Sequence, residues 1–129
     1  MNDVYVDSSA LVAVAFGASP AGVLSCLSSS RIFAGSLVEA ELAAVFRRER
    51  RAAAEVRAMA ATWTLVVPSE SLLPELDRVL DAGYLRGADA WHLACALWLS
   101  PNPKHLGFVT LDTAQAAVAR AIGFPVVDS

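Results

Sequence analysis

Five short apolar runs recur along the chain, and turn residues flank each of them. They span residues 4–7, 31–35, 64–68, 107–111 and 124–128. β-Branched and aromatic side chains are frequent in these runs, which is typical of buried strands. The segments between them are longer and carry apolar residues at helical spacing. This alternation predicts βαβ units, and therefore an α/β fold with a parallel sheet covered by helices on both faces.

Two of the intervening segments predict helices with particular clarity. The segment 36–50 places four apolar residues on one stripe, at i, i+4, i+7 and i+8: Val38, Leu42, Val45 and Phe46. The segment 69–83 predicts a helix that begins with a serine cap and ends at Gly83. Pro125 cannot donate a backbone hydrogen bond, so the last strand is expected at an edge of the sheet.

Composition narrows the class of protein. The chain has 129 residues, of which 56% are hydrophobic, and is expected to form one domain over residues 1–129. Its apolar runs fall well short of the roughly 20 residues that span a bilayer, so no membrane association is expected. The segment 1–16 carries Asp3 and Asp7 where a signal peptide needs Lys or Arg, which predicts a cytoplasmic protein. The net charge of −3 gives no overall attraction to nucleic acid.

Four acidic residues lie near the ends of predicted elements. Asp7 closes the first strand, Glu41 lies one turn into a helix, Asp89 begins another helix, and Asp112 follows the fourth strand. In open α/β sheets, ligands bind outside the carboxyl ends of the strands. Two carboxylates about 4 Å apart repel by roughly 4 kcal/mol at an effective dielectric constant near 20. A divalent cation would remove that cost, and oxygen ligands favour Mg²⁺ or Mn²⁺ over zinc.

Each of these acids also has a purely structural interpretation. Asp7 can end a strand and begin a turn, while Asp89 and Asp112 can simply cap helices. Glu39 flanks the same apolar stripe as Glu41, so periodicity does not choose between the two glutamates. Taken singly, none of the four acids decides the function.

Four stretches together resemble the PIN domain, and most closely the VapC toxins of bacterial toxin–antitoxin pairs. They are "VYVDSSALVAV", "SLVEAELAAVF", "LRGADAWHLACAL" and "FVTLDTAQAAVARAIGFPVV", in the order of the family. The resemblance implies a five-stranded parallel sheet and a metal-dependent endoribonuclease that hydrolyses RNA phosphodiester bonds. It favours Glu41 over Glu39, because the family motif places a leucine directly after the glutamate, as Leu42 does here. One departure is that "DTAQA" lacks the bulky residue often found three positions after the last acid.

The resemblance also implies roles for individual residues. The family's four metal-binding and catalytic carboxylates correspond to Asp7, Glu41, Asp89 and Asp112, which would hold Mg²⁺ with Mn²⁺ as a substitute. Ser9 and Thr110 match small polar positions that would orient the ligands. The expected partners are an RNA substrate, a VapB-like antitoxin protein and a second copy of the chain in a homodimer.

Other residues have two interpretations each. Four arginines cluster within "RRERR", and Arg86 precedes Asp89; they are candidate RNA contacts or an ordinary solvated surface: Arg47, Arg48, Arg50, Arg51 and Arg86. His92 lies one helical turn after Asp89, where it either packs in the core or touches the site.

Two other functions stay open. One is a PIN-fold interaction module that has lost catalysis and acts through protein contacts. The other is a metal-dependent phosphohydrolase of another α/β fold, with Asp7 as nucleophile. Such an enzyme usually needs a second aspartate two residues later, where this chain has Ser9.

Overall fold

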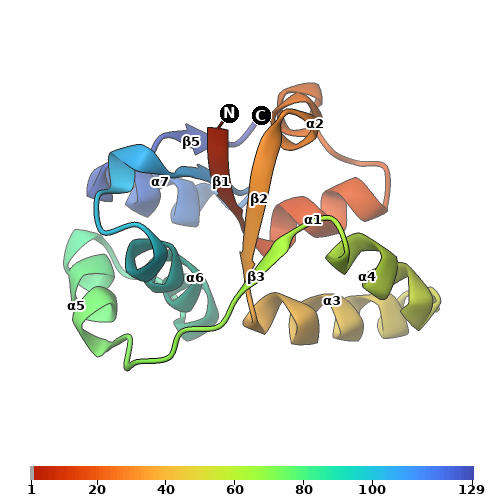
Figure 1. The fold of residues 1–129 in the computed structure, drawn as a ribbon, viewed down its shortest axis with the longest axis horizontal. Coiled ribbons are helices and arrows are strands. Elements are labelled where there is room, and N and C mark those ends of the chain that lie inside the picture. Colours follow the sequence, from red (N-terminus) through yellow and green to blue (C-terminus); the bar gives the residue numbers. More distant parts are fainter. Residues whose placement is uncertain (1) are drawn as a thin grey trace.

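The computed structural model describes residues 2–129, and within them five strands form one sheet (Figure 1). The strands are β1 (Asn2–Val6), β2 (Ser30–Gly35), β3 (Thr64–Val66), β4 (Gly107–Val109) and β5 (Val126–Val127). Their order is β3-β2-β1-β4-β5, and every neighbouring pair is parallel. The predicted α/β fold with a parallel sheet is confirmed, and β5 lies at an edge as Pro125 indicated. The predicted runs 64–68, 107–111 and 124–128 extend beyond the strands that form.

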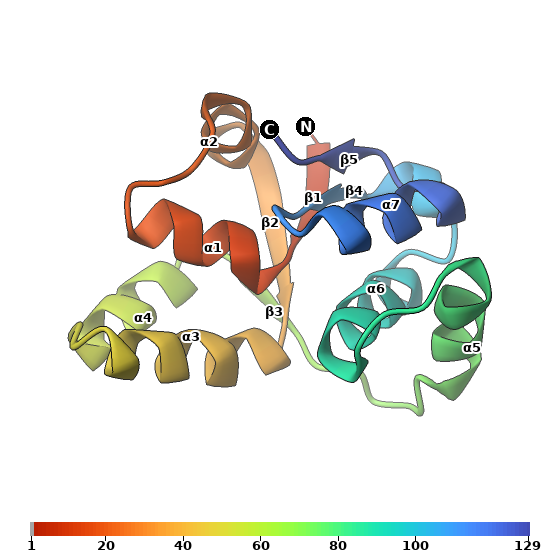
Figure 2. The same cartoon turned by 180° about the vertical axis from the view of Figure 1, so that it is seen from behind.

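Helices cover both faces of this sheet, as Figures 1 and 2 show from opposite sides. One face carries α1 (Ser8–Ala15), α2 (Ala21–Ser28), α3 (Leu37–Arg48) and α4 (Ala53–Ala60). The other carries α5 (Leu73–Ala82), α6 (Gly87–Leu99) and α7 (Thr113–Ile122). A short 3₁₀ helix, Pro103–His105, leads into β4. No helix within residues 2–129 has both the length and the apolar character needed to cross a membrane.

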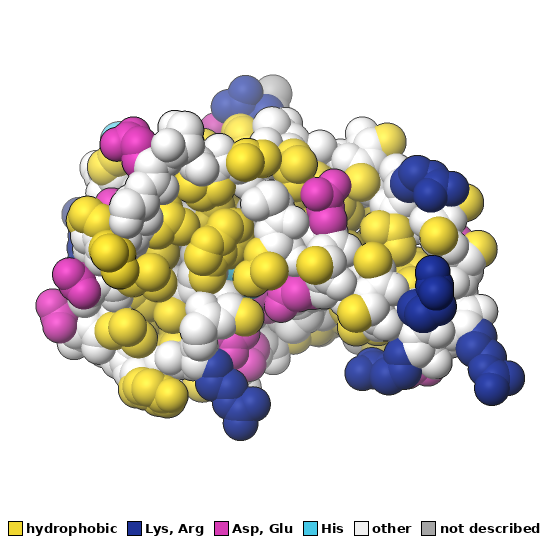
Figure 3. Space-filling model, turned by 90° about the horizontal axis from the view of Figure 1, so that it is seen from below, with side chains coloured by type: hydrophobic (Ala, Val, Ile, Leu, Met, Phe, Trp, Pro, Cys, Tyr) yellow, Lys and Arg dark blue, Asp and Glu magenta, His cyan; other side chains and the backbone are white. Residues whose placement is uncertain are grey.

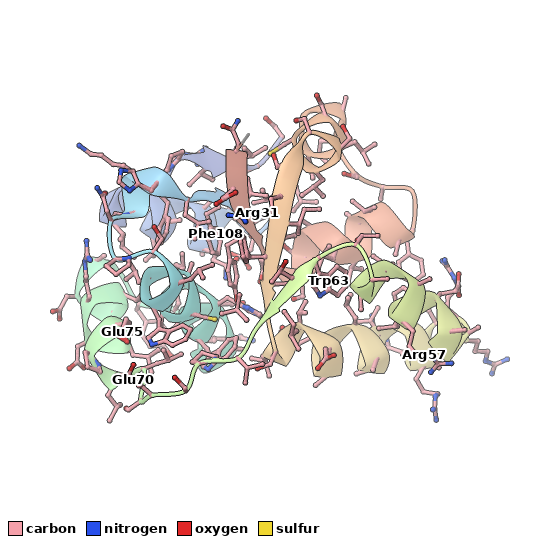
Figure 4. All side chains as sticks on the ribbon, viewed as in Figure 1. Arg31, Arg57, Trp63, Glu70, Glu75 and Phe108 are labelled. Atoms are coloured by element: carbon pink, nitrogen blue, oxygen red, sulfur yellow. The ribbon has the colours of Figure 1, made fainter. Side chains whose placement is uncertain are left out.

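Two hydrophobic cores lie on the two faces of the sheet. Side chains alternate along β1, so Val4 and Val6 pack in the core under α1–α4, whereas Tyr5 packs under α5–α7. The Tyr5 ring stacks on Phe108 of β4, with ring centroids 5.5 Å apart. Figure 4 labels one residue from each core, Phe108 and Trp63, on opposite sides of the sheet. Residues that share a strand thus reach opposite faces.

The predicted helix over 69–83 is correct at its end and wrong at its start. It ends at Gly83 as expected, but its N-cap is Leu72, which makes no side-chain capping bond. The Ser71 hydroxyl accepts a hydrogen bond from the Leu73 N–H at 3.2 Å, so the serine lies one position before the cap. Pro74 in the first turn favours a helix start here, because proline needs no N–H partner there.

The strand order reverses between β1 and β4. From β1 the chain moves outward to β2 and β3, then returns to place β4 on the other side of β1. Asp7 directly follows β1, and its backbone N–H donates to the Val109 carbonyl oxygen at 2.9 Å. In parallel α/β sheets, the carboxyl ends of strands at such a reversal form a crevice where ligands bind. A ligand-binding site is therefore expected at this edge of the sheet.

Candidate active site

The four predicted acids all lie at this edge, each near the beginning of a helix. Asp7 is the N-cap of α1 and Asp112 is the N-cap of α7. Asp89 lies in the first turn of α6, whose N-cap is Arg86, so the interpretation of Asp89 as a simple helix cap is wrong. Glu41 lies in the second turn of α3. Helix N-termini carry partial positive charge, which offsets part of the repulsion among these acids.

The acids are close enough for their charges to act on one another. Burial raises the pKa of the Asp89 carboxyl, and the charges of three other acids raise that pKa further: Asp112, Asp7 and Glu41. His92 acts in the opposite direction and lowers the pKa. The four acids thus form one electrostatic cluster, although Asp7 and Asp112 are 105 positions apart in the sequence. We call this cluster the acidic site; its residues are Asp7, Glu41, Asp89 and Asp112.

Asp7 is the most deeply buried acid of the site, with 3% of its surface exposed. Its Oδ2 atom accepts hydrogen bonds from the Ser9 hydroxyl at 2.7 Å and the Ser9 N–H at 3.1 Å, and it lies 3.3 Å from Thr110 Oγ1. Its Oδ1 atom is buried without a hydrogen-bond partner among residues 2–129. A buried unpaired carboxylate oxygen is costly, and a bound cation would satisfy it.

Gln115 is a polar residue of the site that the sequence pattern did not reveal. Its fully buried side chain accepts a hydrogen bond from the Thr110 hydroxyl at 2.7 Å and donates to the Asp89 carbonyl oxygen at 3.1 Å. Its backbone N–H donates to Asp112 Oδ1 at 2.8 Å. Gln115 therefore ties together the segments that carry two of the acids. The only sequence signal was a glutamine three residues after a helix cap.

Glu41 contacts His92, which is also fully buried. His92 Nε2 lies 2.6 Å from Glu41 Oε1 and 3.8 Å from Asp7 Oδ1. On the other side of the ring, Nδ1 lies 2.7 Å from the Tyr5 hydroxyl oxygen. His92 thus both packs in the core and touches the site. Glu39 is exposed on the same helix, so the structure separates the two glutamates that periodicity left equivalent.

The carboxylates suit a hard divalent cation in their chemistry but are not gathered around one point. Among residues 2–129, no three His, Cys, Asp or Glu side chains are arranged to hold a metal ion. Three of the four carboxylates make hydrogen bonds to different partners instead of facing a common point: Asp7 to Ser9, Glu41 to His92, and Asp112 to the first turn of α7. The free, buried Oδ1 of Asp7 fits a cation; the other carboxylates would have to turn toward it.

The candidate RNA-contacting arginines fall into different environments. Arg51 forms an ion pair with Glu55 at 2.7 Å, and its guanidinium lies over the Phe16 ring at 4.7 Å. The Arg51 guanidinium is therefore already occupied by contacts within the protein. Arg47, Arg48 and Arg50 are exposed, and basic side chains are prominent at the end of the molecule formed by α3 and α4 (Figure 3).

A scan against models of known protein families finds none that matches this chain, and a search of curated proteins finds no match either. The resemblance of the four motifs therefore stays a hypothesis.

Proposed function

We propose that this chain is a metal-dependent endoribonuclease of the PIN-domain type, the toxin of a toxin–antitoxin pair. The observation that carries the proposal is the convergence of four carboxylates at the reversal of strand order, with one buried oxygen of Asp7 left unpaired. A domain that needed only structural caps would have no reason to keep these mutually repelling charges together. The motif resemblance supplies the reaction class.

The protein's own residues prepare the site for a cation. Asp7, Glu41, Asp89 and Asp112 would hold Mg²⁺ or Mn²⁺, which when bound would activate water and stabilise negative charge on a phosphate. The Ser9 hydroxyl donates to Asp7 and fixes the direction in which that carboxylate points. Loss of such a supporting hydrogen bond typically costs about 10–100-fold in metal affinity or activity.

The RNA substrate would approach from the edge that carries the acids. Exposed Arg47, Arg48 and Arg50 lie at the far end of α3 from Glu41 and would contact phosphates. Arg86 is exposed at the N-cap of α6, three residues before Asp89, and is a second candidate for phosphate contact. Arg48 and Arg51 are both paired, with Glu49 at 3.2 Å and with Glu55 at 2.7 Å. Arg51 is the weakest of the five candidates because it is also half-buried and packs over the Phe16 ring.

The surface also supports the proposed protein partners. Large apolar side chains are exposed on β3, α5 and the segments next to them: Leu65, Val67, Leu73, Leu80 and Tyr84, the last with 85% of its surface exposed. Exposed apolar side chains of this size are typical of interaction surfaces when they lie together. We assign them to an antitoxin or to a second copy of the chain, with the complex acting in the cytoplasm.

Calorimetric titration with Mn²⁺, followed by RNA cleavage, tests the proposal. Four partner-free proteins are compared: the wild type, Asp7→Asn, Asp89→Asn and the control Asp77→Asn, which removes an exposed acid of α5. The proposal expects saturable Mn²⁺ binding and RNA cleavage in the wild type and the control, and the loss of both in the two site variants.

Two other outcomes would assign a different function. A folded wild type that neither binds Mn²⁺ nor cuts RNA would refute the nuclease and favour the non-catalytic interaction module. Hydrolysis of a phosphomonoester without cleavage of RNA would favour the phosphohydrolase. Asparagine is nearly isosteric with aspartate and is also a preferred helix cap, so the Asp7 variant should keep the fold.

A further inference from the structure

His92 and Tyr5 form a buried chain of hydrogen bonds that ends on Glu41. The Gly35 N–H donates to the Tyr5 hydroxyl oxygen at 3.1 Å, and that oxygen lies 2.7 Å from His92 Nδ1. His92 Nε2 then lies 2.6 Å from Glu41 Oε1. Tyr5 and His92 are both fully buried. Each of these contacts involves a side chain, so none belongs to the backbone hydrogen bonds of the sheet or the helices.

The partners determine where the protons lie along this chain. An ionised Glu41 can only accept, so Nε2 of His92 must carry a hydrogen. With the hydrogen on Nε2, Nδ1 can accept, and the Tyr5 hydroxyl 2.7 Å away is placed to donate to it. The Tyr5 oxygen meanwhile accepts from Gly35. The arrangement with His92 in the Nε2–H form pairs Glu41 Oε1, both ring nitrogens and the Gly35 N–H.

We propose that His92 is a positioning residue, held in its Nε2–H tautomer by Tyr5, that fixes the Glu41 carboxylate for metal binding. The proposal rests on the metal-dependent function proposed above. The His92 N–H occupies Oε1 of Glu41, and no hydrogen bond reaches Oε2 from residues 2–129. Oε2 is therefore the oxygen left for a cation. Without His92, the Glu41 side chain on the second turn of α3 loses the only hydrogen bond that it makes within residues 2–129.

The first test observes the tautomer in the metal-free protein by ¹⁵N–¹H correlation of the histidine rings. The chain has two histidines, so a His105→Gln variant assigns the signals of His92. The proposal expects a protonated Nε2 and an unprotonated Nδ1 for His92, and an upfield shift of the Nε2 proton in Glu41→Gln. An Nδ1–H tautomer, or a proton resonance that Glu41→Gln leaves unchanged, would overturn it.

The second test measures Mn²⁺ affinity by calorimetry. His92→Leu removes the donor, and His92→Gln keeps an amide N–H near the position of Nε2. Loss of a supporting hydrogen bond to a metal ligand costs about 10–100-fold in affinity, which is the expectation for His92→Leu. His92→Gln keeps a donor and should therefore lose much less affinity than His92→Leu. His105→Leu, which changes an exposed histidine, should match the wild type.

The outcomes separate this inference from the proposed function. A wild type without Mn²⁺ binding or RNA cleavage refutes the function, whatever the variants do. A wild type that binds, with unchanged affinity in His92→Leu or equal losses in His92→Leu and His92→Gln, refutes the positioning role alone. If His92→Leu does not fold, Tyr5→Phe replaces it, because it keeps the ring and removes only the hydroxyl. Tyr5→Phe leaves Nδ1 without its partner, so the ring should be held less firmly against Glu41 and Mn²⁺ binding should weaken; an unchanged affinity would overturn the proposal.

Discussion

Gly35, at the end of β2, is a position where adding a single methyl group should lower the stability of the fold. A Cβ atom at residue 35 would lie 2.8 Å from Cη2 of Trp91, and closer still to Cζ3 of that ring and to the Tyr5 hydroxyl. Tyr5 is fully buried between the sheet and α6, so it has little room to move aside. Gly35→Ala therefore forces a rearrangement in the core.

The cost follows from the contacts that the added methyl group disturbs. Overpacking a core typically costs about 1–3 kcal/mol. Displacing the Tyr5 hydroxyl from the Gly35 N–H adds about 1 kcal/mol for the lost hydrogen bond. We expect the free energy of unfolding to fall by roughly 2–4 kcal/mol in total. At roughly 3–5 °C per kcal/mol for a chain of this length, Tm should fall by at least about 6 °C.

The matched control is Gly87→Ala, in the first turn of α6. A Cβ at residue 87 meets nothing within 4 Å, so the change adds no clash. Because alanine loses less conformational entropy on folding than glycine, Gly87→Ala should stabilise the protein by about 0.4–1 kcal/mol. Urea and thermal unfolding followed by circular dichroism measure both variants. Equal stability of Gly35→Ala and the wild type would refute the close packing of Tyr5 and Trp91 against β2.

Three further predictions concern the acidic site and the cysteines. Burial and the neighbouring acids raise the pKa of Asp89, so the folded state binds more protons than the unfolded state, and its stability decreases as pH rises through that pKa. Asp89→Asn should thus raise the free energy of unfolding of the metal-free protein at pH 7, by less than about 1 kcal/mol after solvent screening. Urea unfolding should show that this gain shrinks toward pH 4, whereas a destabilised variant would contradict the prediction. Gln115→Ala leaves buried partners unpaired and should cost about 1–3 kcal/mol in the same assay, whereas a change below about 0.5 kcal/mol would show that water replaces the side chain. Burial raises the pKa of the Cys95 thiol to about 11, so a thiol reagent at pH 8 should label only half-buried Cys26 until the protein is unfolded. Mass spectrometry measures the labelling of each cysteine, and equal labelling rates would contradict the burial of Cys95.

The order and type of the main elements could be predicted from the sequence because buried strands and amphipathic helices leave different periodicities. Their ends could not be predicted as well, because side-chain hydrogen bonds set them. The predicted run 107–111 stops as a strand at Val109, where the Thr110 hydroxyl begins to bond Gln115 and the Leu111 N–H bonds Ser9. Ser9 lies 102 positions away in the sequence and Gln115 lies in the helix that follows, so no pattern within the strand indicates either partner.

The acids of the candidate site were found because ligands of open α/β sheets bind at the carboxyl ends of the strands and because the four motifs resemble a known family. Not all of their supporting residues were found in this way. Tyr5 lies between two valines in a strand and reads as an ordinary core residue. Its hydroxyl matters only because the register places it beside Gly35 of β2 and because α6 packs above it. Glu41 was separated from Glu39 only by the resemblance, and in the fold it is the contact with His92 that separates them.

The acidic site combines groups that are well satisfied with one that is not. Asp7 Oδ2, Thr110, Gln115 and His92 all have hydrogen-bond partners, so this part of the fold does not lack donors in general. Asp7 Oδ1 has no hydrogen-bond partner within residues 2–129, although His92 Nε2 lies only 3.8 Å away; that nitrogen contacts Glu41 at 2.6 Å instead. Selection for stability alone would favour a neutral residue at position 7, because a buried unpaired charge is among the costliest features a core can hold. A site that recruits a cation explains the same features at once, since the ion would satisfy Oδ1 and screen the charges that raise the pKa of Asp89. The unpaired oxygen and the charge repulsion that destabilise the metal-free chain would be relieved when the ion binds, and this relief would contribute to the affinity for the metal.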